Sequence, residues 1–543
     1  MKKILPVCLL FFAVLVSYYS LALNNSPGLY GDDAGYVIWA KSMLNGGGLD
    51  YTNEPEPRKS GFVLYVLPAL IAPLVYLTKK IAVYKIVPLI FSVFAIFLFL
   101  MYLKSKFVSY KLITVSLLLL IFNPLFFEYS HQIMAENIFI FLSLATVILA
   151  ERYEKSLKIF DFNFIFLIIL SVLSYFTRAA GITLIASVIV YFFIKSPKKT
   201  AAILCAYLIF FGIFGLVRNY GKPVEKEKYS SIILMKSQYE PEAGIRNIAD
   251  VFKDASRKSL VYTMRLLPDM FIYPFFKNVK PSIRSLNFIL QAASGLFIFI
   301  LICAGLFFRL ASYQKYSCFF FKNIVGKISN FSDLSGLIFN FKKNKTFFKN
   351  MEFPAVYIIL TVLMLLIWQI YSSRYLLPLL PFIIYYFVSG AIKILNRKTF
   401  ILCIILLLAF NIIGQFKIIY LERTGYLPDE WKFYYSTMDY IDFNSQKQIN
   451  VICRKPLSYH IVSDYKLKTI GYPLSSNPEE IHNFVATNKI NYIIRDNFAI
   501  SGVNTASKYL DPYLNKYLNE LELIYVSSDG ITKLYKVLTQ KLR

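Results

Sequence analysis

Long apolar runs separated by short basic loops constrain this chain more than any other feature. The first run follows Met1-Lys2-Lys3 and continues to about Leu23. About 20 apolar residues are enough to cross a bilayer as a helix. We therefore expect an uncleaved first membrane helix here in preference to a secretory signal. The other expected spans lie at about 86–103, 112–127, 137–150, 162–178, 180–194, 200–217, 286–309, 353–371, 375–391 and 399–420.

The composition agrees with a membrane protein. Hydrophobic residues make up 57% of the chain and charged residues 17%, whereas soluble domains have about 45–50% and about 25%. Disorder is excluded, because aromatic and branched residues are too abundant. The sequence therefore predicts an α-helical polytopic membrane protein of about 11 to 13 spans.

The apolar segment 61–78 decides which side of the membrane each later loop faces. If it lies on the bilayer or only dips into it, the loops rich in lysine and arginine all face the cytoplasm, as the positive-inside rule requires. Lys79, Lys80 and Lys85 count against this choice, because they would then lie outside. We expect a cytoplasmic N-terminus and attribute most of the net charge of +27 to orientation, with no nucleic acid partner. The cytoplasmic basic loops would be 104–111, 152–158, 195–199, 309–352 and 393–398.

Three substantial pieces are expected outside the membrane: a first loop at 24–60, a long loop at 218–284 and a C-terminal region at 421–543. The last has a different composition from residues 1–420. Segments 449–454 and 491–496 are typical of strands, 478–488 of a helix and 520–538 of a hairpin. The sequence therefore predicts a transmembrane domain at 1–420 followed by a soluble extracytoplasmic α/β domain at 421–543.

Several other kinds of site are excluded or weakly indicated. The six cysteines are scattered and form no disulfide framework, and three histidines are too few for a zinc site. No glycine-rich phosphate loop is present, which argues against an ATP-driven pump.

The run GLYGDDAGYVIWAKSMLNGGGLDY at 28–51 places two adjacent carboxylates, Asp32 and Asp33, directly after the first span. Aspartate at a helix start is stabilised by free backbone N–H groups, so the pair could simply cap a helix. Tyr36 and Trp39 of that helix are expected to be interfacial anchors.

The Tyr-Gly-Asp-Asp-x-x-Tyr run, followed by a glycine-rich turn, resembles the GT-C glycosyltransferases. Protein O-mannosyltransferases and the lipid A aminoarabinose transferase are the most similar kinds. The resemblance covers roughly residues 4–420. It implies sugar transfer from a polyprenyl phosphate carrier, with the first acid near the acceptor. Asp32 matches that first acid, and Asp33 stands where glutamate is commoner.

Two further segments match the same pattern. In EPEPRKSGFVLYVLP at 54–68, Arg58 and Lys59 resemble the lysine that precedes the membrane segment in the aminoarabinose transferase, although Ser60 replaces the usual proline. Both are expected to hold the donor phosphate. Either cation could instead bind lipid headgroups. Glu136 occupies the position of the family's acid at the start of a span, while Glu128 and His131 are expected at the loop surface.

Two arginines complete the candidate site. Arg178 in YFTRAAG and Arg374 in YSSRYLLPLLP fall at the outer ends of closely joined spans. Arginine at membrane depth is costly unless paired, and its guanidinium suits bidentate phosphate contact. RYLLPLLP resembles an Arg-Tyr-x-x-Pro stretch of the family, so Arg374 is expected to bind the donor phosphate. Arg178 could equally be an interfacial anchor.

Together these features predict an inverting glycosyltransferase of the bacterial inner membrane. It would transfer a sugar from a polyprenyl-phosphate-linked donor to a hydroxyl of an envelope lipid, glycan or protein. Asp32 would be the general base, and Asp33 and Glu136 would position the acceptor or a divalent cation. The two aspartates could hold Mg²⁺ or Mn²⁺, and the need for a metal stays open. The alternatives are a lipid-linked-sugar flippase and an oligosaccharide ligase or polymerase.

Overall fold

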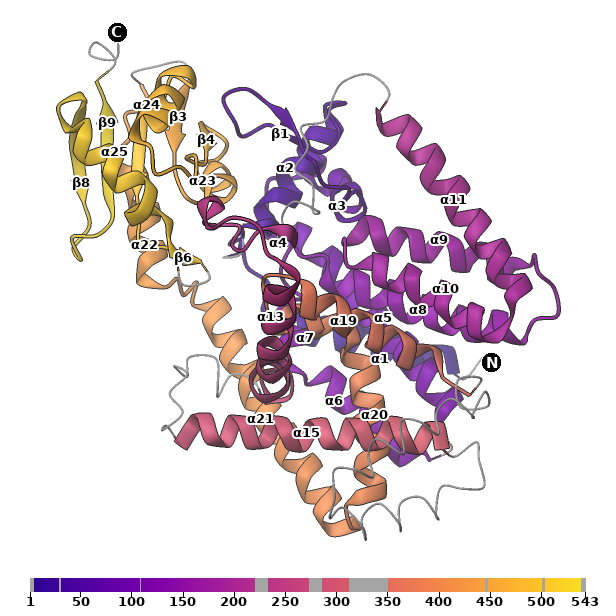
Figure 1. The fold of residues 1–543 in the computed structure, drawn as a ribbon. Coiled ribbons are helices and arrows are strands. Elements are labelled where there is room, and N and C mark those ends of the chain that lie inside the picture. Colours follow the sequence, from indigo (N-terminus) through magenta and orange to yellow (C-terminus); the bar gives the residue numbers. More distant parts are fainter. Residues whose placement is uncertain are drawn as a thin grey trace.

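The computed structural model describes residues 4–28, 31–107, 109–219, 233–272, 286–311, 350–444, 448–500 and 503–538. Most of the described chain up to Arg423 is helical, and a small mixed sheet follows (Figure 1). Parts of the expected loop 218–284, including Arg284, and most of the expected basic stretch 309–352 lie outside the described residues.

Every expected span coincides with at least one helix. Five described segments are long and apolar enough to cross a membrane: Ile81–Lys106, Pro197–Leu216, Leu286–Leu310, Ser373–Ile394 and Arg397–Arg423. Several others are shorter, so the number of spans stays a prediction. The helices are α1 (Ile4–Ser20), α5 (Ile86–Lys106), α6 (Tyr110–Ile121), α8 (Glu136–Lys155), α9 (Phe162–Thr177), α10 (Gly181–Lys195), α11 (Pro197–Asn219), α15 (Leu286–Ala311), α19 (Phe353–Ile367), α20 (Leu380–Ile394) and α21 (Arg397–Arg423).

The expected span at 112–127 is two helices and not one. Helix α6 ends at Ile121, and the short α7 (Pro124–Glu128) begins after Asn123. The Asn123 side chain accepts a hydrogen bond from the Phe126 N–H at 2.9 Å and caps α7. Proline restricts the residue before it to extended conformations, which explains the break.

Charged side chains gather at two ends of the helical region. At one end, Lys106 pairs with Glu151 at 2.8 Å and with Glu352 at 3.3 Å, and Lys195 pairs with Glu154 at 3.0 Å. These residues belong to the loops expected in the cytoplasm, except Glu151, which directly precedes one of them. At the other end lie the candidate site residues described below.

The segment expected to lie on the membrane or re-enter it contains helix α3 (Val66–Leu77). Just before it, the Ser60 N–H donates to the Leu49 carbonyl, and just after it Lys79 pairs with Asp464 of the C-terminal region at 3.3 Å. Twelve residues of helix extend only about 18 Å, and both flanks contact parts expected outside. These contacts favour the prediction that 61–78 does not cross.

The C-terminal region is a five-stranded sheet in the order β4-β3-β5-β9-β8. Strand β3 pairs in parallel with β4 and β5, and β9 pairs antiparallel with β5 and β8. Trp431 and Tyr459 pack on one face, and Ile481 and Tyr513 on the other. The expected strands, helix and hairpin are present. The elements are β3 (Ile449–Ile452), β4 (Leu467–Ile470), β5 (Tyr492–Arg495), β8 (Leu521–Val526), β9 (Lys533–Val537), α22 (Asp429–Ser436), α23 (Pro456–Val462), α24 (Pro478–Thr487) and α25 (Asp511–Lys516).

The first loop packs against this domain, as Figure 1 shows for α2 (Asp32–Leu44) and β1 (Asp50–Tyr51) beside α23 and β4. Asn53 exchanges two hydrogen bonds with the Thr469 backbone, at 2.7 and 2.8 Å. Tyr36 and Trp39 are buried, with the Trp39 ring against Tyr51. The expectation that they anchor α2 at the membrane interface is therefore wrong, because α2 is covered by protein.

Candidate active site

A turn containing Gly28 and Gly31 determines how the side chains of Asp32 and Asp33 are oriented. Gly28 and Gly31 have φ values of +94° and +87°, which favour glycine. A Cβ at Gly28 would lie 1.6 Å from Asp33 Oδ2, so only glycine leaves room for that carboxylate. Helix α2 then begins at Asp32.

Adjacent positions give the two carboxylates opposite environments. Asp33 is fully buried, and its Oδ1 accepts hydrogen bonds from the Gly31 and Ala34 N–H groups at 2.9 and 3.0 Å. The Asp32 side chain is 55% exposed and accepts a hydrogen bond from Arg374 Nη2 at 2.7 Å. Asp32 is therefore the acid that a substrate can reach, and the buried Asp33 holds the turn.

Glu136, the first residue of α8, forms ion pairs with both Arg178 and Arg374. Its Oε1 contacts Arg178 and Arg374, while the side chain is fully buried. The two arginine side chains are each 13% exposed. A carboxylate so placed fixes both guanidinium groups and neutralises part of their charge.

Separate local structures position the members of this cluster. Arg178 follows α9 as its C-cap, with its N–H on the Ser174 carbonyl. Arg374 lies in the 3₁₀ helix η4 (Ser373–Leu379), whose start is capped by the Ser372 hydroxyl. The structure thus brings together four sequence-predicted residues, Asp32, Glu136, Arg178 and Arg374, from segments far apart in the chain.

The other two predicted cations lie elsewhere. Arg58 is in the β1–β2 hairpin, where β2 is Arg58–Lys59, and its Nε donates to Glu54 at 2.8 and 3.0 Å. Its guanidinium also stacks on Tyr51 at 4.7 Å. Lys59 is exposed on the same hairpin, opposite Asp50. Their roles as phosphate ligands stay predictions.

Two expectations about the neighbouring loop are wrong. Glu128 and His131 were expected at the loop surface, yet both are buried. His131 Nε2 lies 3.6 Å from a Glu422 carboxylate oxygen, and Glu422 also accepts from Asn24. The end of α21 covers this loop, which explains the burial.

Two residues near Asp32, Lys455 and Tyr239, were not selected from the sequence. Lys455, in the turn after β3, lies close enough to Asp32 and Asp33 for both to act on its pKa. Burial and the neighbouring Arg454 lower the pKa of Lys455, and the two aspartates oppose them. Burial raises the pKa of Tyr239, the nearby Arg454 lowers it, and Asp32 raises it further. The adjacent cations Arg454-Lys455 after a strand were the signal available in the sequence.

The aspartate pair does not fit the suggested divalent cation site. Asp33 turns its Oδ1 to the backbone of its own turn, whereas Asp32 pairs with Arg374. Among the residues that the structure describes, no three His, Cys, Asp or Glu side chains lie together in a way that could hold a metal ion. A cation needs several convergent oxygens, so we assign no catalytic step to a metal.

Asp33→Asn should stabilise the protein at neutral pH. Burial, with a smaller effect of Asp32, raises the pKa of Asp33 from its ordinary value of 3.8 to about 7. A carboxyl with a raised folded pKa stabilises the fold below its unfolded pKa, and that stability is lost as pH rises through the folded pKa. The apparent Tm of Asp33→Asn minus that of the parent should therefore increase from pH 4 to 7.

Thermal unfolding in detergent at several pH values measures this difference. Asp429→Asn is the control, because Asp429 also begins a helix but is 76% exposed. A Tm difference for Asp33→Asn that does not change with pH would contradict the buried assignment.

Comparison with known proteins gives the fold. No family model and no curated protein matches the sequence. Among solved structures, ArnT from Cupriavidus metallidurans bound to undecaprenyl phosphate is similar with 10% identity, 97% of each chain covered and a TM-score of 0.53. Apo ArnT gives 11% identity, 99% of this chain, 98% of that chain and 0.51.

A second kind of similar structure is the archaeal oligosaccharyltransferase AglB from Archaeoglobus fulgidus, in complex with an inhibitory peptide and a dolichol-phosphate. It shares 12% identity over 98% of this chain and 74% of that chain, with a TM-score of 0.50. The GT-C fold suggested by the sequence resemblance is therefore confirmed.

Proposed function

We propose that this protein is a membrane glycosyltransferase that transfers a sugar from a polyprenyl-phosphate-linked donor to a hydroxyl of an envelope lipid, glycan or protein. The observation that carries the proposal is the position of Asp32. Its half-exposed carboxylate lies against Arg374, in a cluster whose second arginine and buried Glu136 hold the geometry. The GT-C fold and the phosphate-bearing lipids named with the similar structures support it.

Inverting transfer would need one base and one phosphate-binding group. The acceptor oxygen attacks the sugar C1, its proton passes to Asp32, and the C1–O bond breaks with its electron pair leaving on the lipid phosphate. Arg374 would stabilise the charge that grows on that phosphate, with Arg178 as its neighbour.

The ion pair between Asp32 and Arg374 would couple these two roles. While Arg374 donates to Asp32, the guanidinium and the carboxylate occupy each other's hydrogen-bonding positions. A donor phosphate that engages Arg374 would compete for this contact and leave the Asp32 carboxylate available to the acceptor hydroxyl. The fixed contact of Arg374 with Glu136 keeps the guanidinium in place during the exchange.

The test is reconstitution of the purified full-length protein in liposomes with a polyprenyl-phosphate sugar and envelope extracts as acceptors. We expect a covalent sugar product, detected by mass spectrometry, and the same product missing from cells without the gene. Movement of intact lipid-linked sugar across the bilayer with no covalent product would support the flippase alternative. Transfer of whole oligosaccharides would support the ligase alternative.

A further inference from the structure

A pocket of about 570 Å³ lies between the β1–β2 hairpin of the first loop and the C-terminal domain. Tyr51 and Arg58 line it from the hairpin, and Arg454, Gly471, Tyr472 and Phe484 line it from the domain. Ligand pockets typically measure about 300–1,000 Å³. The pocket is separate from the Asp32 cluster, since none of the four cluster residues lines it.

The pocket occupies a favoured position in the sheet. The chain runs from β3 to β4 on one side of β3 and then to β5 on its other side, and all three strands are parallel. Arg454 follows β3, and Gly471 and Tyr472 follow β4, so they share the carboxyl edge. Open sheets of this kind bind ligands outside the carboxyl ends of the strands, near the point where the strand order reverses.

Arg454 has unmet hydrogen-bonding capacity in this pocket. Its Nε and Nη2 atoms are buried and have no hydrogen-bond partner among the described residues. Its guanidinium lies 5.4 Å from the ring centre of Tyr239. A buried donor without an acceptor is costly, and a planar guanidinium is matched by the two oxygens of a phosphate or carboxylate.

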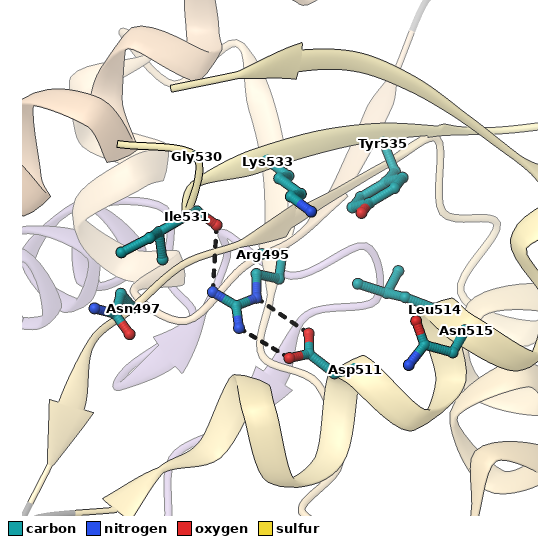
Figure 2. A pocket seen from close by; sticks show the side chains of 9 residues that line it. All are labelled: Arg495, Asn497, Asp511, Leu514, Asn515, Gly530, Ile531, Lys533 and Tyr535. Carbon is teal, nitrogen blue, oxygen red and sulfur yellow. Dashed lines mark hydrogen bonds and ion pairs between the residues drawn. The ribbon is translucent and has the colours of Figure 1, made fainter. Parts of the chain in front are cut away.

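A second pocket in the same domain contains an arginine, Arg495, whose hydrogen bonds are made within the protein (Figure 2). There Arg495 donates to both Asp511 oxygens, at 3.1 and 2.8 Å, and to the Ile531 carbonyl at 3.3 Å. Arg495 therefore has its anion within the protein. Among the described residues, Arg454 has no such anion at hydrogen-bonding distance, which makes it the cation whose hydrogen bonds a ligand would complete.

The remaining lining suggests the body of the ligand. Tyr51, Tyr472 and Phe484 offer aromatic surface. A Cβ at Gly471 would meet nothing within 4 Å, so the backbone there borders open space. Arg58 is already bonded to Glu54. This lining suits a ring-sized body that carries one oxyanion.

The pocket adjoins the proposed transfer site. A Cβ on Gly35 of α2 would lie 3.4 Å from Leu457, which lines the pocket. Tyr239 contacts Arg454 through its ring, and Asp32 is among the charges acting on its hydroxyl. A ligand held by Arg454 would therefore lie beside the helix that begins at Asp32.

We propose that this pocket binds the phosphate or carboxylate of an acidic sugar ring in the acceptor, with Arg454 donating the hydrogen bonds. The identification of the ligand as the acceptor rests on the proposed function, whereas the oxyanion site does not. The proposal makes the C-terminal domain and the first loop two walls of one acceptor site.

The binding test uses the purified full-length protein with glucose 6-phosphate and glucuronate as probes and glucose as the neutral reference. A saturable rise in apparent Tm reports binding. Arg454→Met should weaken binding of at least one acidic probe roughly tenfold or more, as expected for lost charge-assisted hydrogen bonds. Gly471→Leu should do the same by filling the pocket, and it keeps the test valid if Arg454→Met does not fold. Lys432→Met, which removes an exposed cation from the same domain, should change nothing.

Three outcomes overturn the oxyanion site: no saturable binding of either acidic probe, equal binding of glucose, or unchanged affinity in both pocket variants.

Steady-state kinetics of sugar transfer then identify the ligand. Arg454→Met should raise the KM for the acceptor roughly tenfold and leave the KM for the lipid-linked donor unchanged. A rise only in the donor KM would overturn the acceptor assignment. If no transfer occurs, the proposed function fails while the binding result still stands.

Discussion

Asp32→Asn should lower the rate of sugar transfer roughly 10²- to 10⁴-fold, the usual contribution of a positioned general base. The amide has nearly the shape of the carboxylate and can still accept a hydrogen bond from Arg374, but it cannot take the acceptor's proton. Because Asp32 is half exposed, the substitution leaves no buried cavity. The protein should therefore stay folded and inserted.

The measurement is single-turnover transfer from a lipid-linked donor, alongside size-exclusion profiles and apparent Tm. Asp429→Asn should transfer at the parent rate, because Asp429 is an exposed residue at the start of α22 and pairs with a lysine three residues away, at 3.0 Å. Asp33→Asn should affect stability more than the chemical step, since Asp33 faces the backbone of its turn. Near-parent transfer by Asp32→Asn would remove Asp32 from the role of base.

Sequence reasoning identified the residues of the cluster but not their partners. Asp32, Glu136, Arg178 and Arg374 could be chosen because charge beside apolar runs is costly and because of the family resemblance. Which carboxylate meets which arginine depends on helix packing. Asp32 and Arg374 are 342 positions apart, and no local pattern encodes such a contact.

The orientation and the partners of charged side chains in the first loop were the least predictable features of the site. Asp32 and Asp33 read alike in the sequence, yet Gly28 and Gly31 turn one carboxylate inward and leave the other exposed. Similarly, Arg58 reads as a free phosphate ligand, but the hairpin places Glu54 beside it. In both cases the deciding information is backbone conformation within a few residues, which a charge pattern does not contain.

The C-terminal domain shows the same limit at longer range. Its strands, helix and hairpin could be predicted from apolar patterns and turn residues. Its contact with the first loop could not, because Asn53 and Thr469 are 416 positions apart and both hydrogen bonds between them use the Thr469 backbone. Trp39 is buried against the rings of Tyr51 and Phe62, which is why a tryptophan typical of a membrane interface lies inside the protein.

Glu136→Gln should lower stability more than any other single change to the candidate site. Glu136 is fully buried and contacts both Arg178 and Arg374. Without its charge, two largely buried cations face each other with only Asp32 to offset them. Removing one partner of a buried ion pair typically costs about 3–5 kcal/mol. Transfer should also be lost, because Arg374 no longer has a fixed position.

A double variant tests whether the stability loss of Glu136→Gln comes from the unbalanced charge of the two arginines. Glu136→Gln combined with Arg178→Met removes one anion and one cation, so its apparent Tm should lie above that of Glu136→Gln alone. Glu240→Gln is the matched control, since Glu240 pairs with Lys508 at 2.6 Å but both side chains are about one third exposed. Exposed pairs contribute about 0–1 kcal/mol, so its Tm should barely change. Equal Tm losses for Glu136→Gln and Glu240→Gln would show that the cluster is hydrated, and Arg374 would then be free to bind phosphate without Glu136 as its support.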